Sequence, residues 1–163
     1  MDNIDAGLLL VRCVFGLFLA WHGVNKVRSG LAGTANWFGS IGMRRPVLQA
    51  RAAAATEIAG GVMFAAGLLT PLAAASIIGT MLVAVVTVHW RVGFFIFLPN
   101  GGWEYCASIG VLAAAVSLAG PGAASLDNAL GVAHTTTAGV AGIVTGLLVG
   151  TLHLLATWRP KGA

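Results

Sequence analysis

Long apolar stretches alternate with short polar segments along this chain, and the pattern predicts a bundle of helices that cross a membrane. About 20 helical residues, rising 1.5 Å each, span the roughly 30 Å hydrocarbon core of a bilayer. The apolar stretches of this length predict five spans, at residues 6–27, 50–70, 72–90, 103–119 and 138–158. The second and third meet at Thr70 and Pro71, which predicts a tight hairpin with proline at the start of the new helix.

Two connections between the predicted spans are themselves apolar. Trp37, Phe38 and Ile41 of the first connection predict a segment that lies in the headgroup layer of the membrane. Residues 91–102 read RVGFFIFLPNGG, which is too apolar for a loop in water. We expect this loop to enter the membrane interface or to pack under the bundle.

The composition agrees with a membrane protein. The chain is 58% hydrophobic and 9% charged, with a mean hydropathy of +0.89, far from the averages of soluble domains. No basic residue precedes the first apolar stretch, so we expect that stretch to be a retained span and not a cleaved signal peptide. The expected fold is therefore an all-α polytopic membrane bundle of four helices, residues 1–130, plus a fifth C-terminal transmembrane helix within residues 131–163.

The charged residues predict the orientation of this bundle. Alternating five spans places eight basic residues on one side of the membrane: Lys26, Arg28, Arg44, Arg45, Arg51, Arg91, Arg159 and Lys161. The other side holds Asp2, Asp5 and Asp127. Because basic residues accumulate on the cytoplasmic side, we expect the N-terminus outside the cell membrane and the C-terminus in the cytoplasm. The net charge of +4 then reflects topology, and we expect no nucleic-acid partner.

Two charged residues fall inside predicted spans, Arg12 in the first and Glu57 in the second. An ionised acid at mid-membrane costs roughly 2.5–3.5 kcal/mol, so both side chains must face protein. A buried Arg12–Glu57 pair that only orients helices is one interpretation. The other is that both residues line a site for a polar head group in an apolar slot.

Several more polar groups fall at similar depth near the cytoplasmic ends of the spans and predict one pocket: His22, Lys26, His89, Glu104, Tyr105 and His153. A quinone needs an apolar sleeve for its tail and hydrogen-bond donors for its carbonyl oxygens, which these residue types supply. Glu57 and Glu104 are candidates for proton exchange. Haem held by His22 and His89 is a second alternative, although their spacing does not require it. No metal site is predicted.

The two cysteines predict no disulfide. Cys13 and Cys106 are about 15 Å apart along the membrane normal by helical rise, whereas bridged Cα atoms lie within about 7 Å. We expect both thiols to be packing residues.

The fifth span carries a small residue at every fourth position, which predicts a helix-packing groove. Such a stripe lets another helix approach closely, and that helix belongs either to this chain or to a partner subunit or second copy. The stripe consists of Ala138, Gly142, Gly146 and Gly150.

The order of these features along residues 6–130 resembles the DoxX family. The residues that carry the resemblance are Arg12, Gly23, Lys26, Glu57, Gly60, Gly61, Gly67, Leu68, Pro71, Gly93, Phe94, Phe95, Trp103, Glu104, Tyr105, Gly120, Pro121, Gly122, Ser125, Leu126 and Asp127. Members resemble the small membrane subunit of thiosulfate:quinone oxidoreductase. The resemblance implies a four-helix membrane bundle near the quinone pool, with Arg12, Glu57 and Glu104 as matching polar positions. The fifth span departs from this pattern.

The function expected from these features is an integral membrane subunit of a quinone-linked oxidoreductase assembly, with electrons supplied by a partner on the cytoplasmic side. Arg12 is expected to bind the head group, Glu57 and Glu104 to relay protons, and His22 or His89 to bond a carbonyl oxygen. The alternative is a non-catalytic scaffold that docks partners through its fifth helix. A proton-coupled carrier is a third class, but the second and third spans lack the broken helices of transporters.

Overall fold

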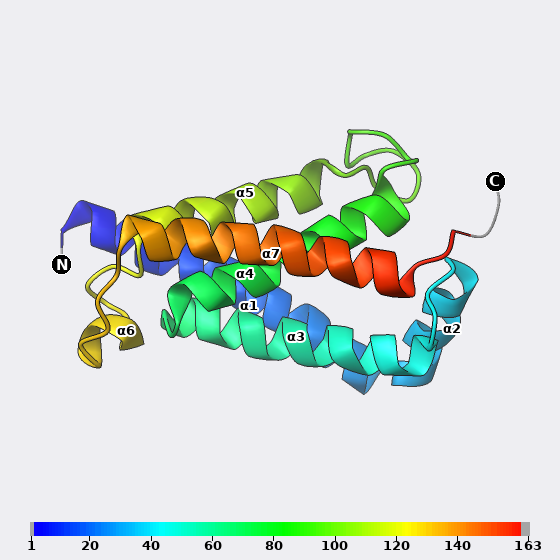
Figure 1. Cartoon of the computed structure of the whole chain (residues 1–163), viewed down its shortest axis with the longest axis horizontal. Coiled ribbons are helices and arrows are strands. Elements are labelled where there is room, and N and C mark those ends of the chain that lie inside the picture. Colours follow the sequence, from blue (N-terminus) through cyan, green and yellow to red (C-terminus); the bar gives the residue numbers. More distant parts are fainter. Residues whose placement is uncertain (1, 161–163) are drawn as a thin grey trace.

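The computed structural model describes residues 2–160, which form a bundle of five long helices with three shorter helical segments (Figure 1). The order is α1 (Asn3–Arg28), α2 (Leu31–Ser40), α3 (Pro46–Ala66), α4 (Thr70–Ala84), η1 (Val85–His89), α5 (Glu104–Ala119), α6 (Leu126–Ala129) and α7 (Thr136–Thr157). The segment η1 is a π-helix that continues α4 without a break. Each of the five predicted spans corresponds to one long helix, so the predicted all-α membrane bundle is confirmed.

Three helices in residues 2–160 are both long and apolar enough to cross a membrane, namely Asn3–Arg28, Thr70–His89 and Thr136–Thr157. The helix α5 is apolar but has only 16 residues. The helix α3 is long enough, with 21 residues, but carries Gln49, Arg51 and Glu57. The two helices with the weaker membrane signal therefore run beside three clear spans in one bundle.

The hairpin between α3 and α4 follows from local sequence, although its position differs from the prediction. Gly67 ends α3 with φ +62°, a left-handed conformation that glycine adopts without strain. Pro71 lies in the first turn of α4, as predicted, where its missing N–H is not needed. At the other end of α3, Pro46 also begins the helix, so the second span starts before residue 50 and ends before residue 70.

Small residues bring α1 and α3 into direct backbone contact. A Cβ added at Gly16 would lie 2.5 Å from the carbonyl oxygen of Gly61 and 2.7 Å from the backbone nitrogen of Ala65. Gly23 lies about one turn after Ala20 on α1. It approaches the backbone of Ala54 in the same way. Only glycine fits at these positions, and the close approach fixes the register of α1 on α3.

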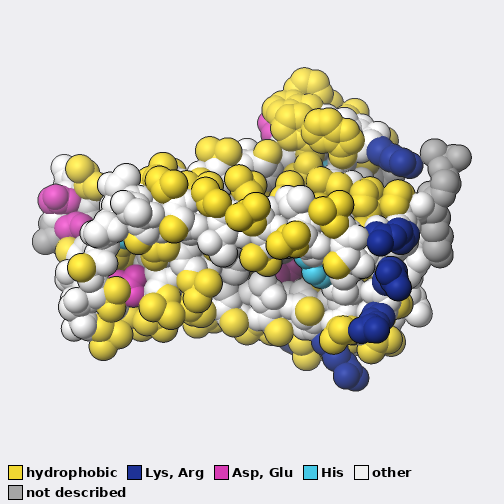
Figure 2. Space-filling view, in the orientation of Figure 1, with side chains coloured by type: hydrophobic (Ala, Val, Ile, Leu, Met, Phe, Trp, Pro, Cys, Tyr) yellow, Lys and Arg dark blue, Asp and Glu magenta, His cyan; other side chains and the backbone are white. Residues whose placement is uncertain are grey.

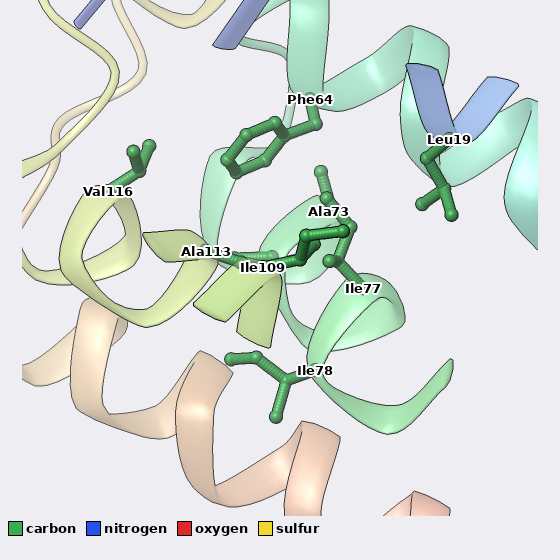
Figure 3. Packing of buried hydrophobic residues seen from close by; sticks show 9 residues of the cluster. Leu19, Phe64, Ala73, Ile77, Ile78, Ile109, Ala113 and Val116 are labelled. Carbon is green, nitrogen blue, oxygen red and sulfur yellow. The ribbon is translucent and has the colours of Figure 1, made fainter. Parts of the chain in front are cut away.

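The apolar core lies where α3, α4 and α5 meet (Figure 3). Figure 3 shows the ring of Phe64 from α3 above Ala73 and Ile77 of α4, with Ile109 and Ala113 of α5 beside them. Alanine at several of these positions keeps the helices close, and α4 occupies the centre of the bundle with α3, α5 and α7 around it.

The small-residue stripe of α7 packs inside this chain. Gly142 faces the carbonyl of Pro71, Gly146 faces Ala75, and Gly150 faces Gly79, all on α4. Gly142, Gly146 and Gly150 are buried, as is the neighbouring Gly139, whereas Ala138 is half-buried. Of the two neighbours that the stripe left open, a helix of this chain is the one that fills the groove, because α4 packs against it.

The C-terminus of α7 is fastened to the loop between α2 and α3. Arg44 N donates to Thr157 O at 2.7 Å, and Arg159 N donates to Gly42 O at 2.9 Å. The indole nitrogen of Trp158 also donates to Ile41 O at 2.9 Å. We call this contact of residues 41–44 with residues 157–159 the C-terminal clasp; it joins α2 and α7 at one end of the bundle.

The other end is held by Asp127, which lies in the short helix α6 and is buried. Its carboxylate accepts hydrogen bonds from Leu69 N at 2.7 Å, Thr70 N at 2.9 Å and Thr70 Oγ1 at 2.8 Å. The two N–H groups are free backbone donors at the start of α4, where a carboxylate is favoured by the helix dipole, and the third donor is a side-chain hydroxyl. Asp127 thus fixes the segment after α5 onto the α3–α4 hairpin.

Charged side chains gather at the two ends of the bundle and apolar ones between them (Figure 2). Basic residues crowd the end that holds the C-terminal clasp, while acidic residues lie toward the N-terminal end. Of the eight basic residues that predict the cytoplasmic side, Lys161 lies outside the described residues. Many large apolar side chains along the middle are exposed, for example Leu148 and Leu152 on α7, as expected of a lipid-facing surface.

The apolar connections form an aromatic edge at the basic end. The loop that follows η1 carries Phe94, which packs edge-on against Trp103, and Phe97, which is 77% exposed. Trp90 stacks on Trp103 with ring centroids 5.8 Å apart. The first connection contains the helix α2, in which Trp37 is exposed and Ala35 is buried.

Candidate functional site

The bundle contains one large cavity among residues 2–160, with a volume of about 730 Å³, which is within the usual range for small-molecule sites. It lies between α1, α3, α4, α5 and α7, and α2 covers part of it near the basic end. Figure 1 shows that α3 and α4 lie together at their hairpin and diverge toward that end. The walls are mostly apolar, with Phe15, Phe18, Leu19, Phe38, Met63, Leu72, Ile109 and Val149 among the lining residues.

An ion pair lies inside this cavity. Lys26 Nζ is 2.5 Å from Glu57 Oε2, and the side chains are only 21% and 9% exposed. Lys26 is in the last turn of α1 and Glu57 is at the middle of α3. The close approach at Gly23 sets the two helices at the distance that this pair needs. Breaking such a pair is costly, yet apolar residues often replace a buried pair without loss of stability, so its presence points to a role beyond folding.

The same cavity collects the other predicted residues of the cytoplasmic end. His22, His89, Tyr105 and His153 all line it, from four different helical segments. The ring of His89 is oriented by a contact of 2.8 Å between Nδ1 and Gly101 O. His89 ends the π-helix η1, a type of distortion that is frequent at functional sites. Five of the six residues predicted to share one pocket therefore line this cavity together with Glu57, and the sixth, Glu104, does not.

Arg12 lies apart from the cavity and does not pair with Glu57. Its side chain is fully buried beside the hairpin, where Nη2 donates to Ala124 O at 2.6 Å and a Cβ at Gly67 would overlap Nη1. Because Gly16 already sits opposite Gly61, Arg12 is level with the C-terminal end of α3 and far from its middle. The possible Arg12–Glu57 pair is therefore replaced by Lys26–Glu57. No described residue bonds Nε or Nη1 of Arg12.

Glu104 also lies outside the residues that line the cavity. It begins α5, and its Oε2 accepts a hydrogen bond from Ile96 N at 3.1 Å on the exposed aromatic loop. This contact shapes the loop. The structure brings Glu57 into the cavity and keeps Glu104 and Arg12 out of it.

Gln49 is a cavity residue that the sequence reasoning missed. It is 7% exposed, lies in the first turn of α3 and lines the cavity together with Glu57. The predicted span began at residue 50 and left Gln49 in a connecting segment. Proline at position 46 was the signal that places the start of the helix earlier, because proline is favoured in the first turn.

The two cysteines do not pair. Cys13 and Cys106 are free thiols, and Cys13 Sγ lies 3.9 Å from Ala65 O. No cluster of three or more His, Cys, Asp or Glu side chains able to hold a metal ion occurs in residues 2–160.

Known proteins similar to this chain point to one family. Residues 7–90, which include α1 to α4 and the polar residues His22, Lys26, Gln49, Glu57 and His89, match the DoxX family. A protein of Bacillus subtilis (strain 168) named "Putative oxidoreductase CatD" is 33% identical over 103 residues, covering 63% of this chain and 72% of that protein. No solved structure matches the chain significantly. With the family match extending over half of its residues, the chain belongs to the DoxX family.

Proposed function

We propose that this protein is the quinone-binding membrane subunit of an oxidoreductase assembly, and that the quinone head group binds beside the Lys26–Glu57 pair. The observation that carries this proposal is the ion pair itself, enclosed in an apolar cavity of about 730 Å³. The name of the related Bacillus subtilis protein supports the oxidoreductase class.

The residues present fit a quinone head group. Its two carbonyl oxygens accept hydrogen bonds, and Lys26, Tyr105 and the cavity histidines are donors. The ring and the start of the tail need apolar walls, which Phe15, Met63 and Leu72 supply. Leu72 is 54% exposed on the outer surface of α4, so the apolar part of the cavity borders the lipid-facing surface. A long isoprenoid tail would leave the protein there.

The chain's own residues would manage protons at this site. Reduction of a quinone to a quinol takes up two electrons and two protons, and the electrons would come from a partner protein. Glu57 is the only carboxylate among the residues lining the cavity, and its pairing with Lys26 orients it. His22 lies one turn before Lys26 on α1 and also lines the cavity, so its imidazole would exchange protons with a head group bound beside the pair.

The basic end of the bundle is the proposed cytoplasmic side, and it is where the electron-donating partner would bind. The basic end of the bundle carries Arg28 at the end of α1, Arg44 and Arg45 before α3, and Arg91 after η1. Asp2 and Asp5 lie at the opposite end, at the start of α1. The rule that basic loops remain in the cytoplasm then places the N-terminus outside the cell membrane.

Direct binding tests the proposal. The purified protein in lipid nanodiscs would be titrated with a short-tailed benzoquinone, and quenching of tryptophan fluorescence would be followed, since Trp37 lines the cavity. Mass spectrometry of a lipid extract would show whether a native quinone is retained. We expect saturable binding by the wild-type protein and at least a tenfold weaker affinity in the Lys26→Met, Glu57→Leu double variant.

Glu104→Gln is the matched control, because it removes a carboxylate outside the cavity and should bind quinone as the wild type does. The proposal fails if the wild-type protein shows no saturable binding, or if the double variant binds with the wild-type affinity.

A further inference from the structure

Gln49 lines the cavity and carries an amide that has no partner among the described residues. The side chain is 7% exposed, and within residues 2–160 its amide group makes no hydrogen bond; only its backbone N–H does, to Arg45 O at 3.1 Å. A primary amide carries two donors and an acceptor. Among residues 2–160 only Arg12 has fully buried side-chain polar atoms without a partner, so the amide of Gln49 is open to the cavity. A ligand that covered this amide without bonding it would bind poorly. The cavity that Gln49 lines is the place where a partner can bind.

The position of Gln49 relative to the ion pair defines the space for that partner. Gln49 precedes Glu57 by eight residues on α3, which separates them by about 12 Å along the helix axis and by about 80° around it. Both side chains therefore face the same cavity, with Glu57 at its middle and Gln49 nearer the basic end. Phe38 of α2 and Met43 of the C-terminal clasp line the cavity at that end.

We propose that Gln49 is a ligand-binding residue of this site, whose amide bonds an oxygen of the head group on the side away from the Lys26–Glu57 pair. This inference rests on the proposed quinone function and names the residue that selects the head group. An uncharged amide donates to a carbonyl oxygen and accepts from a hydroxyl, so it suits both the quinone and the quinol. A ligand lacking oxygen at that position leaves the amide unpaired and binds less well.

A purely structural role for Gln49 and a ligand-binding role predict different effects of its substitution on protein stability. If the amide served folding, leucine in its place would destabilise the protein. Because the amide has no protein partner, leucine of similar size should leave the thermal midpoint unchanged or raise it. In the ligand-binding role, Gln49→Leu therefore lowers ligand affinity without lowering the thermal midpoint of the protein.

The experiment compares the full-length Gln49→Leu variant with the wild type in nanodiscs. The matched control is Asn36→Leu, which removes an exposed amide on the neighbouring helix α2. Two probes with the same short tail are titrated by tryptophan quenching, displacement or calorimetry: a benzoquinone, and an alkylbenzene that lacks both oxygens. We expect Gln49→Leu to weaken quinone binding by about three- to tenfold, as for one lost hydrogen bond, and to leave alkylbenzene binding unchanged.

Each remaining outcome overturns the inference in a recognisable way. If the wild type binds quinone and Gln49→Leu binds it equally well, Gln49 is not a ligand residue, while the proposed function stands. If Gln49→Leu lowers the thermal midpoint and weakens both probes alike, Gln49 is structural. If the wild type binds no quinone, this inference falls together with the proposed function.

Discussion

Lys26 Nζ lies 2.5 Å from Glu57 Oε2, and this contact joins the last turn of α1 to the middle of α3 inside a mostly apolar cavity. Helix α1 reaches the pair because Gly16 and Gly23 let its backbone approach α3. The glycines that determine helix packing therefore also determine the geometry of the candidate site.

Lys26→Met should destabilise the protein by about 3 kcal/mol, because the carboxylate of Glu57 would be left without its cation. This value is at the low end for buried ion pairs because the side chain of Lys26 is partly exposed. The double variant with Glu57→Leu should recover most of that loss. Thermal unfolding in nanodiscs measures the four proteins of this double-mutant cycle. Purely additive losses would mean that the two side chains do not interact.

Gly16→Ala should destabilise the bundle by about 3 kcal/mol, the upper end for overpacking, because its Cβ would meet the backbone of α3. Gly7→Ala is the matched control on the same helix. Nothing lies within 4 Å of a Cβ at Gly7, so alanine there should be neutral or add up to about 1 kcal/mol through helix propensity. Thermal midpoints by differential scanning fluorimetry separate the two; equal midpoints would contradict the close α1–α3 packing.

Asp127→Ala should cost about 3 kcal/mol, since three donors at the start of α4 lose their acceptor. Asp127→Asn keeps one acceptor oxygen and should cost less. For comparison, Asp2 caps the exposed N-terminus of α1, and Asp2→Ala should cost about 1 kcal/mol. The order of the three unfolding temperatures is the measurement, and a variant at Asp127 as mild as Asp2→Ala would exclude the role of Asp127 in holding the hairpin.

Cysteine labelling in intact cells tests the proposed orientation. In a chain with Cys13 and Cys106 replaced by alanine, Val132→Cys at the acidic end should react with a membrane-impermeant thiol reagent. Ser29→Cys at the basic end should react only after the cells are opened. Both positions are exposed in the structure. The reverse labelling pattern would place the N-terminus in the cytoplasm.

The sequence predicted the helices well because each hydrophobic stretch is long and bounded by glycine, proline or charge. Its largest boundary error was at α3, where Gln49 and Arg51 lower the local hydropathy and hide the first turn of the helix. Hydropathy reports the solvent around a segment, whereas the proline at position 46 reports where the backbone becomes helical.

Tertiary contacts were harder to predict. Depth along the membrane normal suggested Arg12 as one partner for Glu57, but the approach of α1 to α3 at Gly16 and Gly23 decides that Lys26 is within reach. The glycine stripe of α7 predicted a close contact without naming the neighbour, and α4 proved to be that neighbour. Spacing along one helix gives the face that packs, but not the helix that packs on it.

The C-terminal clasp holds α7 beside the cavity, and this position of α7 has a consequence for other members of the family. The matched region ends at residue 90, so Gly146, Val149 and His153, which close one flank of the cavity, come from a part of the chain outside it. Without α7, that flank of the cavity would be open to acyl chains. Exchanging α7 for the last helix of a relative should therefore change the ligand preference of the proposed site, even with every charged group of the cavity left in place.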